Sequence, residues 1–168
     1  MKKLLVFISC IATLQLFAQD RMTPAVKTFE ARTGKAIVLK DNNANGIYAD
    51  ITDNSSSVMF EYKFTASQND AMSDDEYTET LGFNIVPDKT GKFVLKGEEL
   101  RKAQGYFYKG CFCMDRGYAP IIDGIITGVK LSKTTWYVSV NVQIKTKQGD
   151  SEQTITKKLK GKFTITAK

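Results

Sequence analysis

The chain has 168 residues, of which 42% are hydrophobic and 25% are charged, with a formal net charge of +6 and no histidine. The missing histidine excludes Ser-His-Asp and Cys-His catalysis and any zinc site with histidine ligands, and a charge of this size does not require a nucleic-acid partner. The sequence therefore predicts one domain that is not an enzyme, with no cofactor, no metal site and no nucleic-acid partner.

The chain begins with a pattern typical of a secretory signal peptide. Two lysines precede an apolar run from Leu4 to Ala18, which is shorter than a comfortable membrane span. We expect residues 1–18 to be removed, which takes the charge from +6 to +4 because two lysines leave. Residues 19–168 then form a single exported domain that is periplasmic, secreted or held at the cell surface. Lipidation at Cys10 is the alternative, and no later segment is apolar enough to span a membrane.

The first half of the mature chain alternates between short apolar runs and turn residues. Its first segment, Asp20–Arg32, fits a short helix or a strand, and we favour the strand because the following segments are strands. Further strands are expected at Ala36–Lys40, Ile47–Thr52, Val58–Ala66, Tyr77–Val86 and Lys92–Lys96. The turns between them are expected at residues 33–34, 41–46, 54–57 and 87–91. The last of these turns should close a hairpin between its two flanking strands.

One helix and three strands are expected in the second half. The segment Gly97–Gln104 has glutamates at its start, basic residues near its end and Gly105 after it, an order that favours a helix. The strands are expected at Ile121–Leu131, Thr135–Thr146 and Thr154–Ala167. This pattern predicts an all-β fold with one short helix, a small antiparallel β-barrel or sandwich, with an OB-like barrel as one option.

The stretch Gly105–Pro120 differs from the rest because it concentrates glycines, aromatic residues and both cysteines of the mature chain. Two thiols of an exported protein usually pair, and a disulfide between Cys111 and Cys113 would close a very small ring. Left unpaired, they could bind a soft metal, join another molecule or act as a redox dithiol. The simplest structural alternative is a strand with both cysteines on one face.

We interpret the loop Lys109–Tyr118 as the candidate binding surface. Exposed aromatic and methionine side chains on a tip held by glycines are good anchors for a partner's pocket. A small disulfide would order the tip and so lower the entropic cost of binding. The candidate residues are Lys109, Gly110, Cys111, Phe112, Cys113, Met114, Asp115, Arg116 and Tyr118.

Three other features have simpler explanations. Asp41–Gly46 matches the first half of a calcium-binding loop, but the twelfth position is Thr52 and not a bidentate glutamate, so a hairpin turn is favoured. The acidic connection of Asp70, Asp74, Asp75 and Glu76 is expected to be solvated. Lysines near the C-terminus are expected to protect edge strands from pairing, and they lie at positions 145, 147, 157, 158, 160, 162 and 168.

With Cys111-Phe112-Cys113 on a protruding loop of a small exported barrel, the chain resembles proteinase inhibitors. Metalloproteinase inhibitors of the TIMP type place a Cys-x-Cys wedge from an OB-like barrel in the enzyme cleft, and small secreted bacterial inhibitors of the potempin type are similar in size and architecture. The TIMP wedge begins at the mature N-terminus, whose free amine binds the catalytic zinc. The pair here is internal, so the resemblance implies a loop that fills specificity pockets or lies across the cleft as a substrate that resists cleavage.

The expected function is therefore binding of another extracellular protein, most specifically inhibition of a proteinase through Lys109–Tyr118. Two alternatives stay open. One is a barrel that carries a small apolar ligand between Trp136, Phe60, Phe64 and Phe83. The other is a structural protein of the cell envelope.

Overall fold

The computed structural model describes residues 22–42, 46–69, 76–148 and 151–166. The expected signal peptide and Cys10 lie outside this part of the chain. The described elements, in chain order, are β1 (Met22–Thr23), β2 (Val26–Asp41), β3 (Ile47–Thr65), β4 (Gln68–Asn69), β5 (Thr78–Ile85), β6 (Lys92–Lys96), α1 (Glu98–Lys102), β7 (Tyr106–Gly110), β8 (Gly117–Lys130), β9 (Thr135–Gln148) and β10 (Ser151–Ile165). No helix in the described ranges is long and apolar enough to cross a membrane.

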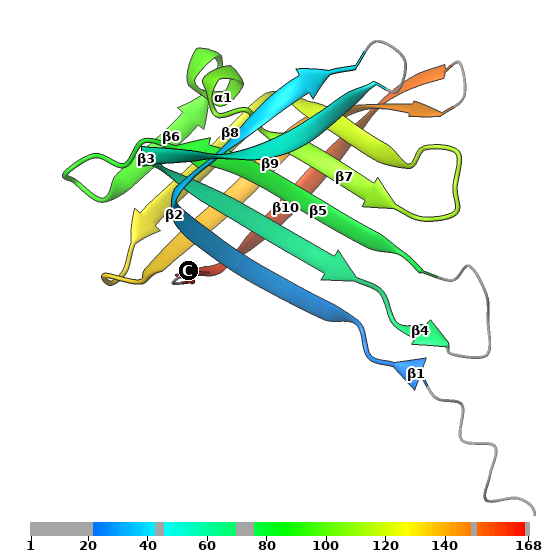
Figure 1. The fold of residues 1–168 in the computed structure, drawn as a ribbon, viewed down its shortest axis with the longest axis horizontal. Helices are drawn as coiled ribbons and strands as arrows, with labels where there is room; N and C mark the ends of the chain where they lie inside the picture. The colour runs from blue at the N-terminus through cyan, green and yellow to red at the C-terminus, as the bar shows by residue number, and fades with distance from the viewer. Residues whose placement is uncertain (1–21, 43–45, 70–75, 149–150, 167–168) are drawn as a thin grey trace, which may run out of the picture.

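The large sheet has eight strands, and all of them except β6 close into a ring in the order β8-β7-β5-β3-β2-β10-β9 (Figure 1). The strands of the ring alternate in direction, and an odd number of alternating strands brings the first and last together in parallel. That parallel contact is short and joins Thr164 and Ile165 of β10 to Glu30 and Ala31 of β2. The predicted all-β class and barrel form are therefore confirmed.

The ring is a meander, because its neighbouring strands follow one another along the chain apart from the small strands β4 and β6. An OB-like barrel has five strands in a Greek-key order, so the OB-like option is not the one that this chain adopts. Short connections instead join β8 to β9 and β9 to β10, and each of these consecutive strands pairs with the next.

Alternating side chains of the strands fill the inside of the barrel. In β9 the apolar face predicted from the period of two is buried, from Trp136 at 1% exposure to Ile144 at 0%. The ring of Phe60 stacks on Phe83 with centroids 5.1 Å apart and meets Trp136 edge-on at 5.8 Å. The rings expected to line a ligand cavity thus contact one another, and Phe64 lies apart from them beside Tyr77. The carrier alternative gains no support from this packing.

Two turns expected in the first half are bulges inside continuous strands. The strand β2 passes through Gly34, which has a left-handed φ of 73°, and residues 54–57 of β3 form no pairs opposite it. The register jumps from Thr33↔Val58 to Lys35↔Asp53. A left-handed glycine and unmatched residues on the partner bend a strand pair without ending it, which local sequence patterns do not distinguish from a turn. The strand preference for Asp20–Arg32 is confirmed from Val26 onward.

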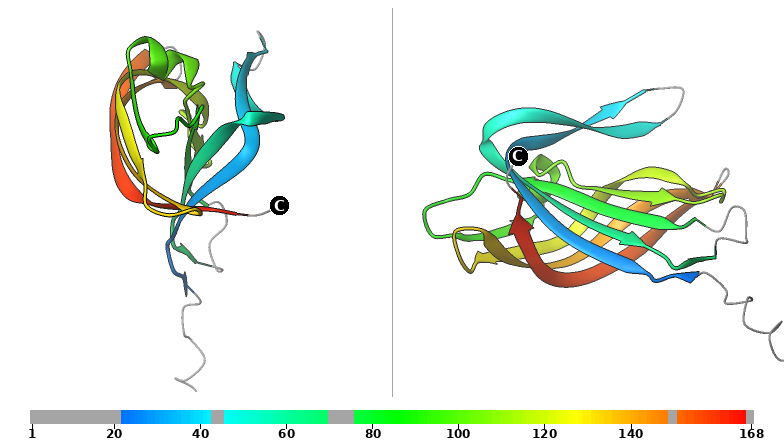
Figure 2. Two further views of the ribbon diagram at one scale, coloured as in Figure 1. Left: turned by 90° about the vertical axis from the view of Figure 1, so that its left-hand side faces the viewer. Right: turned by 60° about the horizontal axis from the view of Figure 1, so that its bottom comes forward.

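Beyond this bulge, residues 35–41 of β2 and 47–53 of β3 form a hairpin that we call the arm. Figure 2 shows the arm standing apart from the barrel wall and curving over its outside. Ile37 of the arm, at 1% exposure, forms a second apolar cluster with Met59 and Tyr106 on the outer face of the barrel. The arm is therefore held by packing on its inner side, and the space between arm and barrel is partly filled.

The expected hairpin between β5 and β6 does not form, because β6 pairs with residues 125–129 of β8. The amide of Lys130 donates to the carbonyl oxygen of Gly91 at 2.8 Å and ties the connection to the end of β8. Lys92–Lys96 is a strand as predicted, and the helix is α1 within the predicted segment. Leu100 and Ala103 are the buried face of the helical segment, at 2% and 4% exposure.

Candidate functional site

The stretch Gly105–Pro120 is a hairpin more than a loop. Tyr106–Gly110 is strand β7, β8 begins at Gly117, and only residues 111–116 form the turn between them. The sequence pattern missed these strand segments because glycines interrupt the apolar alternation. The candidate residues from Cys111 to Arg116 remain together on one protruding turn, whereas Tyr118 belongs to the outer face of β8.

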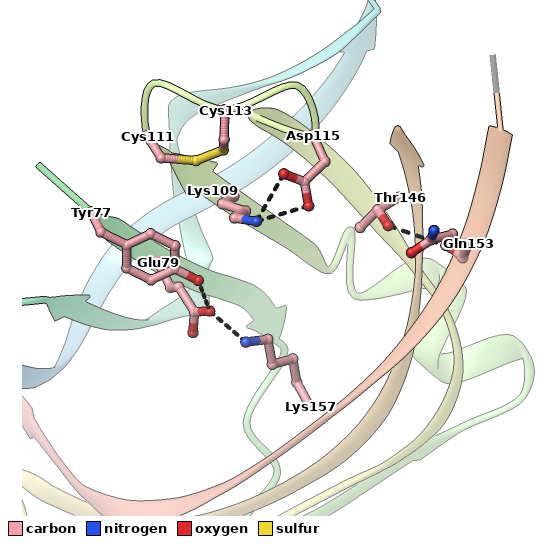
Figure 3. Close-up of polar contacts among 9 residues, drawn as sticks. All are labelled: Tyr77, Glu79, Lys109, Cys111, Cys113, Asp115, Thr146, Gln153 and Lys157. Carbon is pink, nitrogen blue, oxygen red and sulfur yellow. Dashed lines mark hydrogen bonds and ion pairs between the residues drawn. A yellow bond between two sulfur atoms is a disulfide. The ribbon is translucent and has the colours of Figure 1, made fainter. Parts of the chain in front are cut away.

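A disulfide joins Cys111 and Cys113, whose Cα atoms are 5.2 Å apart. Both cysteines are half-buried, so the bridge lies along the inner side of the turn (Figure 3). Phe112 and Met114 alternate with the cysteines and point away from the protein, each 78% exposed. The turn therefore presents two apolar side chains to solvent from a short covalently closed backbone.

The base of the turn is tied by an ion pair. The Nζ atom of Lys109 donates to both carboxylate oxygens of Asp115 at 2.8 Å, and both side chains are mostly shielded from solvent. The same Nζ lies 5.7 Å from the ring centre of Tyr77, a cation–π distance. Lys109 thus links the two ends of the turn and the start of β5. These two candidate residues therefore hold the base of the turn together.

A second polar group lies below this pair, at the same end of the barrel (Figure 3). The Tyr77 hydroxyl donates to Glu79 Oε1 at 2.5 Å, and Lys157 Nζ donates to the same oxygen. Burial, followed by the nearby Glu79 carboxylate, raises the pKa of Tyr77 well above its ordinary value. Lys157 comes from β10 and also lies 4.9 Å from the ring centre of Phe107. This network joins the start of β5 to β10, which are not neighbours in the sheet, and supports the turn from below.

The disulfide changes what the cysteines can bind. The two cysteine sulfurs and one carboxylate oxygen of Asp115 lie within 4.8 Å of one another, a spacing that suits a metal ion. Soft metals bind thiolates, and here the two sulfurs are bonded to each other while Lys109 occupies both carboxylate oxygens. In its oxidised form the turn is therefore a structural support and offers no thiolate ligand.

The surface beside the tip is hollowed. An open hollow of about 420 Å³ is lined by Phe112, Cys113, Met114 and Arg116, and a second of about 350 Å³ extends from Phe112 and Arg116 to Glu76 and Thr78. Within the described ranges the Arg116 guanidinium forms no ion pair. Two exposed apolar side chains, two hollows and the positively charged Arg116 guanidinium thus lie on one small surface.

The remaining sequence features do not join this surface. Asp41 and Gly46 flank a hairpin, as favoured over calcium binding, and residues 43–45 lie outside the described chain. The same holds for Asp70, Asp74 and Asp75, while Glu76 is exposed beside the tip. Among the late lysines, Lys157 points into the barrel end, Lys145 pairs with Glu152 at 2.6 Å, and Lys168 lies outside the described chain.

The structure adds a groove that the sequence did not indicate. It has a volume of about 290 Å³ and lies between the inner side of the arm and the outer face of β3, β5, β7 and β8. Tyr106, Tyr118 and Tyr108 form a ladder along it, with ring centres 5.4 Å and 4.7 Å apart. Tyr106 and Tyr108 are two residues apart on β7 and so share one strand face, but only the folded arm turns that face into a groove.

The Lys109–Asp115 pair predicts a pH dependence for the turn. Hydrogen bonding and charge from Lys109 hold the pKa of Asp115 below its ordinary value. Because the folded-state pKa is lowered, the pair stabilises the turn at pH values above about 4 and loses this effect as pH falls through the lowered pKa. An NMR titration of the Asp115 carboxyl group should show its midpoint rising in Lys109→Met, because the hydrogen bond and the charge that lower its pKa are gone. Asp88, whose pKa Thr90 lowers, should titrate unchanged in the same spectra, and an unchanged Asp115 midpoint would contradict the pairing.

The chain matches no protein-family model, no curated protein and no solved structure.

Proposed function

We propose that this chain is an exported, non-enzymatic protein-binding domain, and most specifically a proteinase inhibitor whose Lys109–Tyr118 loop blocks an active-site cleft. The single observation that carries the proposal is the tip itself. Phe112 and Met114 are 78% exposed on a disulfide-closed turn whose base is tied by Lys109 and Asp115. Exposed apolar residues that lie together on one surface mark interaction sites, and aromatic and methionine side chains are enriched at protein interfaces.

The restrained conformation of the turn favours a specific binding surface over a nonspecific apolar patch. Binding costs free energy when a loop must be fixed in one conformation. Here the disulfide, the ion pair and the network of Tyr77, Glu79 and Lys157 restrain the turn before any partner arrives. A restrained turn with two protruding side chains fits a cleft that receives extended peptide, as the cleft of a proteinase does.

The mode of inhibition follows from the position of the cysteines. They are internal, so the turn has no free amine for a catalytic metal. Phe112 and Met114 would occupy specificity pockets, with Arg116 at the rim as a charged contact. The small ring would resist hydrolysis, because a cleaved bond between the cysteines keeps both ends tethered by the disulfide and favours resealing.

A titration against extracellular metallo- and serine proteinases tests this function. The mature chain with its disulfide intact should inhibit at least one of them at a one-to-one ratio, with the residual activity falling linearly to the equivalence point for a tight complex. Slow cleavage within residues 111–113 should accompany inhibition if the turn lies in the cleft like a substrate. Absence of inhibition of every proteinase at micromolar protein would reject the specific function.

A further inference from the structure

The arm has two edges, and one of them is closed by side chains. Asn84 accepts from the amide of Ile37 and donates to the carbonyl oxygen of Ile37, both at 2.8 Å. Gln104 accepts from the amide of Leu39 at 3.1 Å. The backbone groups of Ile37 and Leu39 thus point away from β3 and are satisfied. Pairing with another strand is blocked along this edge.

The other edge is open. Ile37 pairs with Ile51, and Leu39 pairs with Ala49. In an antiparallel ladder, opposite residues both direct their amide and carbonyl groups either toward or away from each other, so the groups of Ala49 and Ile51 point away from β2. In the part of the chain that the structure describes, no strand pairs with them, since β5 pairs with β3 only from Val58 onward, and the side chain that reaches them is the neighbouring Asp50 carboxylate, at the Ile51 amide.

This open edge is less protected than an ordinary exposed edge, because its two charged residues, Asp50 and Asp53, are paired with Lys40 and Lys35 of β2. The edge of β10 away from β9 meets β2 only at its end, and exposed lysines at 158, 160 and 162 follow its outer face. Charged residues of this kind discourage pairing with other chains. The open edge of the arm carries Ala49 and the 44% exposed Ile51 on its inner side. An edge whose backbone donors and acceptors are not paired with another strand is a template for an added strand.

The groove under this edge specifies what kind of strand would fit. Ala49 and Ile51 form its roof, and the tyrosine ladder together with Thr78 and Thr80 forms its floor. Successive side chains of an added strand point to opposite sides, so every second side chain would enter the groove and contact tyrosine rings. Such a strand combines backbone hydrogen bonds on one side with apolar contact below.

The charges in the groove favour an acidic residue on that strand. Glu61 is already engaged, since Arg32 lies 3.4 Å from its Oε1 atom and the Tyr106 hydroxyl donates to its Oε2 atom at 3.3 Å. Lys63 lines the groove and forms no ion pair within the described ranges. The groove thus keeps one available positive charge, and residues 19–168, the expected mature chain, carry a formal net charge of +4.

We propose that the open edge of β3 at residues 47–53 binds an extended, acidic peptide segment of another protein as an added strand, with a carboxylate on Lys63 and alternate side chains on the tyrosine ladder. A second copy of this chain is the less favoured occupant, because two copies of the same positive charge repel each other. The inference adds a second binding surface to the Cys111–Cys113 tip, and either surface can exist without the other.

A displayed library of random linear peptides, selected against the mature chain, tests this inference. Selected peptides should alternate β-branched or aromatic residues with polar ones and contain Asp or Glu. Synthetic peptides from the selection, labelled for fluorescence anisotropy, should bind about tenfold more weakly to Ala49→Pro, which removes one edge donor and blocks the approach. Ala49→Ser keeps the amide and should bind as the parent does. Lys63→Gln should weaken binding several-fold and reduce its dependence on salt.

Controls separate this surface from the tip. Ala49→Pro leaves the pairing with β2 intact because the Ala49 amide points away from it, and an unchanged circular dichroism spectrum and unfolding midpoint will verify the fold. Phe112→Ala should not alter peptide binding, just as Ala49→Pro should not alter proteinase inhibition. Failure to select any peptide above background, or selected peptides that bind Ala49→Pro as strongly as Ala49→Ser, would overturn the proposal. So would sedimentation that shows a dimer lost only in Ala49→Pro, because the edge would then serve self-association.

Discussion

Replacing both Phe112 and Met114 by alanine is expected to weaken inhibition of a susceptible proteinase by about a hundredfold or more. Each side chain is 78% exposed in the free protein, so its full apolar surface is available to a partner's pocket. Residues that anchor an interface in this way contribute about 2 kcal/mol or more each when truncated. The inhibition constant of the double variant, measured with the proteinase found by titration, checks the expectation.

The same substitution should leave the stability of the free protein nearly unchanged, because surface side chains with few contacts contribute less than about 0.5 kcal/mol. Leu131→Ala is the matched control. Leu131 is 53% exposed in the turn after β8, at the end of that strand opposite the tip. The Leu131→Ala substitution also removes exposed apolar surface, but away from the tip, and should not change inhibition. Full-strength inhibition by the double variant would move the binding surface away from the tip.

Phe60→Ala should cause the largest loss of stability, about 3–5 kcal/mol in the free energy of unfolding. The Phe60 ring is 0% exposed and contacts Phe83, Phe93, Trp136 and Phe163. These neighbours come from β5, β6, β9 and β10, so removal of the ring leaves a cavity that no single strand can close by shifting. Domains of this size have about 5–15 kcal/mol in total, and the loss would remove a large share of it.

Urea unfolding followed by circular dichroism measures this loss, with an unchanged slope showing that the variant unfolds from the same compact state. Val94→Ala on β6, where Val94 is 54% exposed, should shift the free energy by less than about 0.5 kcal/mol. Phe60→Leu should lie between the two, because leucine fills part of the space. A loss below about 1 kcal/mol for Phe60→Ala would contradict the central position of this ring.

At the Cys111–Cys113 turn, the sequence predicted some features of the candidate site and left others open. The cysteine spacing and the exposed character of Phe112 and Met114 were predicted from the segment itself. The contacts that support the turn were not, because Asp115, the Tyr77–Glu79 segment and Lys157 come from three separate parts of the chain. Charge pairs of this kind carry no local pattern, since any lysine and any carboxylate could form them.

What the sequence by itself determined is the set of local features that alternation and turn residues encode. The apolar face of β9, the helix around Leu100 and the all-β class with one short helix follow from side-chain period and capping, which act over a few residues. The protruding cysteine turn follows in the same way, because glycines and a closely spaced cysteine pair limit the backbone locally.

Only the tertiary structure decided which strands pair and what lies between them. The left-handed Gly34 bends β2 and β3 together, so two expected turns are one bulge, beyond which the strand pair continues as the arm. The strand β6 joined β8 and not β5. These choices depend on which strand edge is free when distant segments meet and on how the apolar faces of several strands pack at once. No short window of sequence contains that information, and the tyrosine groove with its open edge exists only because of it.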